Sequence, residues 1–140
     1  METGVIQDEN TVIPWDGTRY PLASWEKDNT MREAIANSVI WYYKELADRV
    51  GKHRMQQQIN QIPYGNCDVS GGHTFWLVSS LKISATEQVD LLKRLYNDQL
   101  LFSRRNMSIA RKIILLSDKE GVYLSGKTGS GFAGGKEIIG

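Results

Sequence analysis

The longest helical pattern in this chain constrains its fold more than any other local feature. Thr30 and Glu33 form a capping box, with threonine at the N-cap and glutamate at the third helical position. Apolar residues then recur at helical spacing as far as Val50, and Gly51 follows as a terminating glycine. The pattern predicts a helix over residues 31–50 whose apolar stripe packs on a core, namely Ala34, Ile35, Val39, Tyr42, Tyr43, Leu46 and Val50.

The remaining patterns predict further helices and one late strand. Short helices are expected over residues 52–62 and 107–116, and a second capping box, Ser84 with Glu87, begins a helix that reaches about residue 96. Residues 119–121 read as a turn and 122–128 as a strand, followed by the glycine-rich 129–131. Residues 5–28 and 63–72 are expected to be loops, and 75–80 are ambiguous between strand and helical turn. The chain should be mostly helical, with strand only at its end.

Both ends of the chain are unusual for a domain. Residues 1–6 resemble the last turn of a helix with a glycine stop, and 134–140 resemble a hairpin turn with the start of a return strand. Domains seldom begin at a helix end or stop inside a hairpin. Composition is that of an ordinary globular chain, with 41% hydrophobic and 24% charged residues in 140. We therefore expect residues 1–140 to form part of one domain.

Charge and cysteine content exclude several classes of function. The net charge of +1 gives no electrostatic case for binding nucleic acid or an anionic membrane. Cys67, the lone cysteine, excludes an internal disulfide and a multi-thiolate metal site, and neither His53 nor His73 has ligand partners at metal spacing. No apolar run approaches the length of a membrane span or a signal-peptide core. We expect no metal, no nucleic acid and no membrane segment here, and the oligomeric state stays open.

Lys127-Thr128-Gly129 at the end of the predicted strand is the main chemical motif. The lysine supplies a fixed positive charge, the threonine a hydroxyl for an anionic substrate, and the glycine lets a ligand lie against the strand. Two companions lie upstream: Ser38-Val39-Ile40 on the predicted helix and Tyr64-Gly65-Asn66 in a predicted loop. One tripeptide recurs by chance, whereas an ordered set of motifs is informative.

Together these residues resemble the class D (oxacillinase-type) serine β-lactamases and their relatives, the sensor domains of β-lactam receptor-transducers. The similarity runs nearly end to end, through residues 2–6, 15–17, 37–43, 64–66, 70–72, 75–77, 81–84, 87–89 and 126–129. It implies an α+β fold of the β-lactamase/transpeptidase type, with an antiparallel sheet and a helical subdomain. The N-terminal strands with the Ser-x-x-Lys helix, and the C-terminal strands and helix, would be missing from residues 1–140.

The resemblance also implies roles around a β-lactam. Ser38 would relay a proton toward the β-lactam nitrogen as the ring opens, close to Lys127. Lys127 and Thr128, with Gly129, would bind the carboxylate of the drug. Ser130 would offer its backbone N–H as half of an oxyanion hole.

Further residues would surround an active-site lysine that this family converts to a carbamate with CO2. Val39 and Ile40 would form an apolar wall, and Trp76 would donate its indole N–H to the carbamate. That lysine is not in this chain, so we expect no cofactor here. Tyr64, Gly65 and Asn66 would shape a loop at the cleft edge. By themselves, Ser38 would be a serine bonded back to a helical carbonyl and Trp76 a core residue; the ordered motifs favour the functional interpretation of Ser38.

The decisive departure from the family is the absence of its nucleophile. In the family a Ser-x-x-Lys lies shortly before the segment that resembles residues 2–4, and here nothing of it is present. Two internal matches exist, Ser24 with Lys27 and Ser79 with Lys82, but so short a pattern often arises by accident. We expect this chain alone to be inactive.

Three functions remain open. The first is β-lactam hydrolysis through a serine acyl-enzyme in the intact family member, an exported bacterial protein. The second is a penicillin-binding sensor domain, and the third is an inert, truncated reading frame. Sensor domains of this family tend to carry a polar asparagine at the position of Ile40, so the apolar residue favours the hydrolase.

Overall fold

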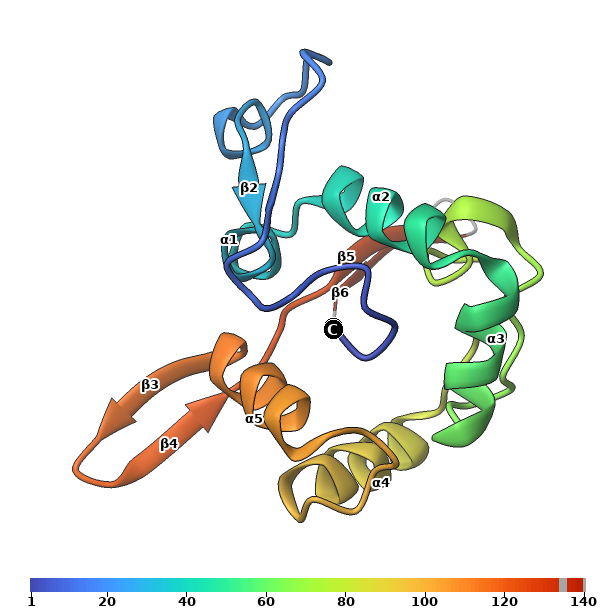
Figure 1. The fold of residues 1–140 in the computed structure, drawn as a ribbon, viewed down its shortest axis with the longest axis vertical. Coiled ribbons are helices and arrows are strands. Elements are labelled where there is room, and N and C mark those ends of the chain that lie inside the picture. Colours follow the sequence, from blue (N-terminus) through green and yellow to red (C-terminus); the bar gives the residue numbers. More distant parts are fainter. Residues whose placement is uncertain (134–135, 140) are drawn as a thin grey trace.

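The computed structural model describes residues 1–133 and 136–139, and for residues from 130 onward only the backbone is described. Figure 1 shows the helices following one another around an arc, with the β3–β4 hairpin projecting away from them. Within the described residues the helices are α1 (Met31–Ala36), α2 (Ile40–Val50), α3 (Lys52–Gln61), α4 (Ala85–Tyr96) and α5 (Arg104–Ile113), with 3-10 turns η1 (Ala23–Trp25) and η2 (Gly72–Thr74). The strands form three antiparallel pairs: β1 (Val12–Ile13) with β2 (Asn29–Thr30), β3 (Leu115–Lys119) with β4 (Val122–Ser125), and β5 (Ser130–Ala133) with β6 (Lys136–Ile139).

The predicted long helix is broken in its middle, which corrects the sequence prediction. α1 ends at Ala36, and Ser38 adopts a left-handed backbone with φ of +53°. The Val39 N–H then donates to the Ala34 carbonyl at 2.9 Å, and the Ser38 N–H to the Ile35 carbonyl at 3.4 Å. This pair of backward bonds is a Schellman motif. Its usual hydrophobic contact is present too, because Ala34 and Val39 are both fully buried in one core cluster.

Two clusters of apolar side chains hold the helices together. The first contains Ile13, Ala34, Val39 and Tyr42 and joins β1 to α1 and α2. Its largest member, Tyr42, also donates its hydroxyl to the Thr11 carbonyl at 3.0 Å. The second contains Ile59, Val69 and Phe75 and joins α3 to the loops around η2. Burying each large apolar side chain contributes about 1.5–3 kcal/mol, so these clusters fix α1, α2 and α3 relative to the segment that carries Trp76.

The predictions for α3 and α4 agree with the structure to within a residue or two, whereas that for the following helix is shifted. α5 begins after Ser103, whose hydroxyl accepts the Asn106 N–H, and it ends at Ile113. The prediction took Leu115 and Leu116 as helical; the structure places them in β3, so strand is not confined to the end of the chain. The predicted turn is present: Glu120 and Gly121 both have positive φ, as a tight two-residue hairpin loop requires.

The structure describes the N-terminal end of the chain fully and the C-terminal end in part. Residues 1–4 form a turn, closed by the Gly4 N–H on the Met1 carbonyl at 3.0 Å, in place of a final helical turn. The return strand predicted near the C-terminus is β6, while residues 134, 135 and 140 of that predicted hairpin lie outside the described residues. Among the described helices, none is both long and apolar enough to cross a membrane.

Candidate active site

One cavity brings together most of the residues that the motifs single out. It has a volume of about 820 Å³, within the range of small-molecule sites. Ser38 and Ile40 reach it from the α1–α2 junction, Trp76 from the loop after η2, and Lys127-Thr128-Gly129 from the segment between β4 and β5. The rest of the lining was not predicted as site residues: Leu22, Trp25, Ala34, Ile35, Asn37, Tyr43 and Leu77. Of these, Ala34, Ile35 and Tyr43 were predicted to lie on the core-facing stripe of the helix. We call it the Lys127 cavity.

Ser38 reaches the Lys127 cavity because the chain leaves α1 in a left-handed turn. The C′ position of a Schellman motif is most often glycine, since a side chain there meets the backbone. Ser38 occupies it with φ of +53° and an exposed side chain. A non-glycine residue in this conformation costs free energy, and such residues concentrate at functional sites.

Hydrogen bonds to the neighbouring Asn37 fix the turn that carries Ser38. The Asn37 side-chain amide donates to the Glu33 carbonyl at 3.0 Å, and the Asn37 carbonyl accepts the Trp25 indole N–H at 3.1 Å. The Trp25 carbonyl in turn accepts the Trp41 indole N–H at 2.9 Å. The η1 loop and α2 therefore clamp the turn from two sides.

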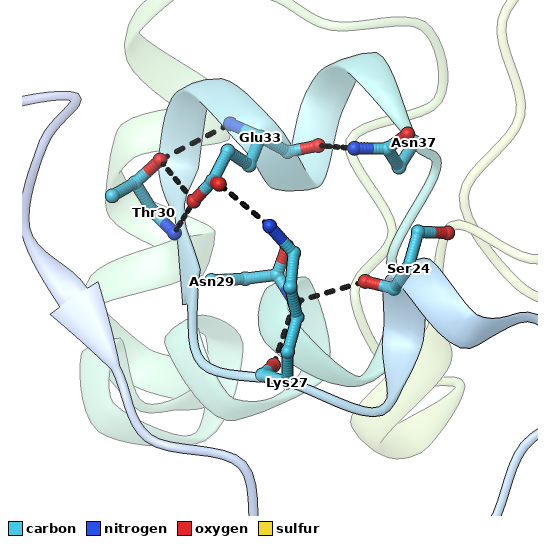
Figure 2. A network of polar contacts seen from close by, with 6 residues as sticks. All are labelled: Ser24, Lys27, Asn29, Thr30, Glu33 and Asn37. Atoms are coloured by element: carbon cyan, nitrogen blue, oxygen red, sulfur yellow. Dashed lines mark hydrogen bonds and ion pairs between the residues drawn. The ribbon is translucent and has the colours of Figure 1, made fainter.

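A polar network at the start of α1, drawn in Figure 2, secures that arrangement. The Glu33 carboxylate accepts the Thr30 backbone N–H at 3.0 Å and the Lys27 ammonium at 2.7 Å. The Lys27 ammonium, together with the backbone N–H and hydroxyl of Thr30, lowers the pKa of Glu33 to about 2. Buried Asn29 donates to the carbonyls of Ser24 and Lys27 at 3.2 and 2.8 Å. The loop that supplies Leu22 and Trp25 to the cavity is thus tied to α1.

Lys127 gives the cavity its positive charge. Its exposed ammonium donates to the Thr128 carbonyl at 2.6 Å and approaches the Thr128 hydroxyl at 3.4 Å. Among the described contacts it makes no hydrogen bond to Ser38, although both residues line the same cavity. Ser130 begins β5 opposite Ile139 in the strand register, and its side chain is outside what the structure describes. A cationic group beside a hydroxyl suits an anionic ligand.

The predicted apolar wall is divided between core and cavity. Val39 is fully buried in the first cluster, whereas Ile40 is 38% exposed and lines the cavity. Trp76 packs edge-on against Phe75, with ring centroids 5.0 Å apart, and joins the second cluster.

The Trp76 indole N–H differs from the other three in the chain. Those of Trp15, Trp25 and Trp41 each donate to a backbone carbonyl. Within the described part of the chain no acceptor is assigned to the Trp76 indole N–H. It is therefore available to an acceptor on a ligand or on another segment.

Tyr64, Gly65 and Asn66 do not line the Lys127 cavity, and Gly65 and Asn66 lie against residues 80–82 instead. Asn66 exchanges two hydrogen bonds with Lys82, each 2.9 Å, and donates its amide to the Ser80 carbonyl at 2.8 Å. Gly65 is required by this close approach, because a Cβ there would lie 1.8 Å from the Lys82 carbonyl oxygen. Tyr64 lines a separate apolar cavity, and burial raises the pKa of its hydroxyl.

Neither internal Ser-x-x-Lys pair makes a hydrogen bond between its serine and lysine among the described contacts. Figure 2 shows the Lys27 ammonium directed at Glu33 and the Ser24 hydroxyl pointing away from it. The Ser79 hydroxyl donates to the Gly71 carbonyl at 3.3 Å. The described residues also contain no group of three or more His, Cys, Asp or Glu side chains that could hold a metal ion.

The sequence and the fold of this chain are similar to those of known proteins. Residues 1–137 match the penicillin binding protein transpeptidase domain family. The chain is 35% identical over 136 residues to the regulatory protein BlaR1 of Bacillus licheniformis, covering 97% of this chain and 23% of that protein. It is 37% identical over 131 residues to the probable β-lactamase YbxI of Bacillus subtilis (strain 168), covering 93% of this chain and 49% of that protein. The crystal structure of a class D β-lactamase from Nostoc superposes with a TM-score of 0.94 at 33% identity, covering 99% of this chain and 59% of that one. The predicted β-lactamase-type fold is confirmed, and the chain spans about half the length of its β-lactamase relatives.

Proposed function

Because the chain belongs to the penicillin binding protein transpeptidase domain family, we propose that it supplies the Ser38–Lys127 side of a β-lactam-binding site in a class D hydrolase. The observation that carries this proposal is the Lys127 cavity, which unites residues about 90 positions apart in the sequence (38 and 127). By the same resemblance we propose that the intact protein is an exported bacterial protein.

The chemistry of this side follows from the groups present. The Lys127 ammonium and the Thr128 hydroxyl bind the carboxylate of the β-lactam, and a charge-assisted bond of this kind contributes about 1.5–3 kcal/mol. Ser38, held in the left-handed turn after α1, passes a proton to the amide nitrogen that leaves when the ring opens. The Ser130 backbone N–H stabilises the developing oxyanion.

The residues present also fit a lysine carbamate, as this family carries. Ile40 provides an apolar surface that buried Val39 backs from the core, and Trp76 has an indole N–H without an assigned acceptor among the described residues. Apolar surroundings favour the neutral form of a lysine amine, which is the form that combines with CO2, and a hydrogen bond from the indole N–H would offset part of the cost of burying the carbamate anion. When bound there, the carbamate supplies a general base; this chain contributes the wall and the donor, and its lysine would come from elsewhere.

The similarity to BlaR1, a regulatory protein, favours a second candidate function, a β-lactam sensor domain that is acylated without turning over. The apolar Ile40 favours the hydrolase, since a polar side chain there would disfavour the carbamate. A third candidate is an inert chain. In each case we propose that the 140 residues alone do not acylate, because they contain no nucleophile at the position where the family has it.

Intact mass spectrometry after incubation with excess benzylpenicillin tests the last statement. We expect no adduct on the 140-residue chain. A stable single adduct would overturn the assignment, and peptide mapping would then choose among Ser24, Ser38 and Ser79.

A chimera tests the proposed roles. This chain replaces the matched segment of the Bacillus subtilis probable β-lactamase, and nitrocefin hydrolysis is measured. Ser38→Ala should lower kcat by about 10²-fold or more, as loss of a proton-transfer group does, and Lys127→Met should chiefly raise KM. Lys119→Met, at the hairpin end, is the matched control. A folded chimera that neither binds nor hydrolyses β-lactams contradicts the proposal, whereas stable acylation without turnover favours the sensor.

A further inference from the structure

The buried carboxylate of Glu9 lies between α1, the helix that precedes Ser38, and α5. The Glu9 side chain is 9% exposed, and its Oε1 lies 2.8 Å from the Arg32 guanidinium of α1 and 3.9 Å from the Lys112 ammonium of α5. The Glu9 carbonyl also accepts the Arg32 N–H at 3.1 Å. We call Glu9, Arg32 and Lys112 the Glu9 bridge. Because a buried anion is costly unless cations compensate it, Glu9 holds both cations, and with them both helices, near one point.

The turn that carries Glu9, residues 7–11, is itself fixed to the helices. The Thr11 hydroxyl accepts the Gln7 N–H at 3.2 Å, which closes the turn. The Gln7 carbonyl accepts the Arg105 guanidinium of α5 at 3.0 Å, and the Thr11 carbonyl accepts the Tyr42 hydroxyl of α2 at 3.0 Å. The turn therefore presents the Glu9 carboxylate from a defined position.

On the α5 side, the Glu9 bridge is connected to Lys127 through the end of the helix. Lys112 lies in the last turn of α5, and the Ile114 carbonyl just beyond it accepts the Gly126 N–H at 2.9 Å. Lys127 follows Gly126 directly. Figure 1 shows β3 leaving the end of α5 and β4 returning toward it. A shift of α5 therefore carries the Lys-Thr-Gly segment with it.

On the α1 side, the Glu9 bridge is connected to Ser38 through a short, capped helix. Arg32 is the second residue of α1, and Ser38 lies two residues beyond the end of that helix at Ala36. The backward bond from Val39 to Ala34 fixes the turn after α1. A shift of α1 therefore carries Ser38 with it.

We propose that Glu9 is a positioning residue, whose carboxylate sets the separation of Ser38 and Lys127 across the Lys127 cavity through Arg32 and Lys112. Glu9 does not itself line that cavity. The separation follows from the geometry alone, whereas its consequence for catalysis rests on the proposed function. Misplacing reacting groups by about 1 Å can cost about 100-fold in rate. Glu9→Gln keeps the volume of the side chain and removes the charge that attracts both cations.

Distances between two spin labels on the 140-residue chain test the separation directly. Nitroxides are attached at Lys44→Cys on α2 and Ser108→Cys on α5, both exposed positions, in a Cys67→Ser background. Double electron–electron resonance should give a narrow distance distribution with Glu9 and a broader or shifted one with Glu9→Gln. Asp98→Asn is the matched control, because it removes a carboxylate 2.7 Å from Arg111 of α5 that does not contact α1. That control should leave the distribution unchanged.

Kinetics of the chimera described above test the consequence for catalysis. Glu9→Gln should lower kcat per folded molecule, as counted by circular dichroism, at least about tenfold. A residue that only stabilises the fold would lower the number of folded molecules and leave this kcat unchanged. Arg32→Met should act in the same way, and the double variant should be no slower than the slower single variant, because the two residues act as one unit. Arg32→Lys, which keeps the charge, should retain more of the activity than Arg32→Met.

The two measurements separate failure of this inference from failure of the proposed function. An unchanged distance distribution in Glu9→Gln overturns the inference, and so does an unchanged kcat per folded molecule in a chimera that is active with Glu9. If the chimera with Glu9 neither binds nor hydrolyses β-lactams, the proposed function fails and the distances alone decide the role of Glu9. Should Glu9→Gln not fold, Lys112→Met takes its place, because that side chain is 65% exposed and forms the α5 end of the bridge. Unchanged distances in that variant would likewise refute the inference.

Discussion

Replacing Ser38 by glycine should stabilise the fold while removing a residue of the candidate site. Ser38 has φ of +53° at the C′ position of a Schellman motif. A side chain in this conformation costs about 1–2 kcal/mol. Glycine in turn lowers the free energy of unfolding by about 0.4–1 kcal/mol, because it gives the unfolded chain more conformational entropy. The net expectation is a gain of about 0.5–1 kcal/mol in the free energy of unfolding. For a chain of this size, that is a rise in Tm of roughly 1–4 °C.

Urea unfolding followed by circular dichroism measures the effect, with Ser38→Ala as the control. Alanine removes the same hydroxyl but keeps the cost of the left-handed backbone, so it should change stability by less than about 0.5 kcal/mol. Exchange of the Val39 amide hydrogen, which donates to Ala34, gives a local measurement and should slow in the glycine variant alone. If Ser38→Gly is no more stable than Ser38→Ala, backbone strain at this turn is not present and the argument from strain to function fails.

Three other changes have expected outcomes. The folded-state pKa of Glu33 is about 2, below its ordinary value of 4.5, so its contribution to stability is complete above pH 4.5 and is lost as the pH falls toward 2; Glu33→Gln should flatten acid unfolding over that window. Gly65→Ala should destabilise the chain by roughly 2 kcal/mol more than Gly17→Ala, because both glycines have positive φ but only the first meets the Lys82 carbonyl; equal losses would show that the clash is relieved without cost. Burial raises the pKa of Tyr42 to about 12; Tyr42→Phe should remove one phenol that ionises near pH 12 in an absorbance titration and cost about 1 kcal/mol in urea unfolding.

Much of the helical framework could be predicted because its signals are local. The two capping boxes, at Thr30 and Ser84, mark the starts of α1 and α4, and the structure forms both with reciprocal hydrogen bonds. The tight turn at Glu120 and Gly121 is local as well. β3 was missed because Leu115 and Leu116 continue the apolar pattern of α5, and only pairing with β4 decides that they are strand.

The motifs predicted several residues of the candidate site, but they did not predict the walls of the cavity around those residues. Lys127 and Trp76 were identified as short patterns, while the walls that surround them depend on tertiary packing. Leu22 and Trp25 lie in an irregular segment, and their one sequence signal was an apolar and an aromatic residue in a loop otherwise rich in turn formers. Their position follows from the hydrogen bonds of the Asn29 amide and from the Lys27–Glu33 ion pair, which no sequence pattern specifies.

The break between α1 and α2 explains why the sequence did not reveal that Ser38 lies in a turn. Helix ends are found in sequences by glycine at C′, and here that position is occupied by Ser38, so the apolar periodicity ran on to Val50 without an apparent stop. The contact that replaces the glycine signal is between Ala34 and Val39, and both also fit an unbroken helix. Only the backward hydrogen bond from Val39 distinguishes the two conformations. A sequence that accepts strain at a helix end, when glycine would relieve it, has a use for the side chain at that point. The failure of the helix prediction at Ser38 therefore leads to the hypothesis that the Ser38 hydroxyl acts in the cavity it lines, which the Ser38→Ala chimera tests.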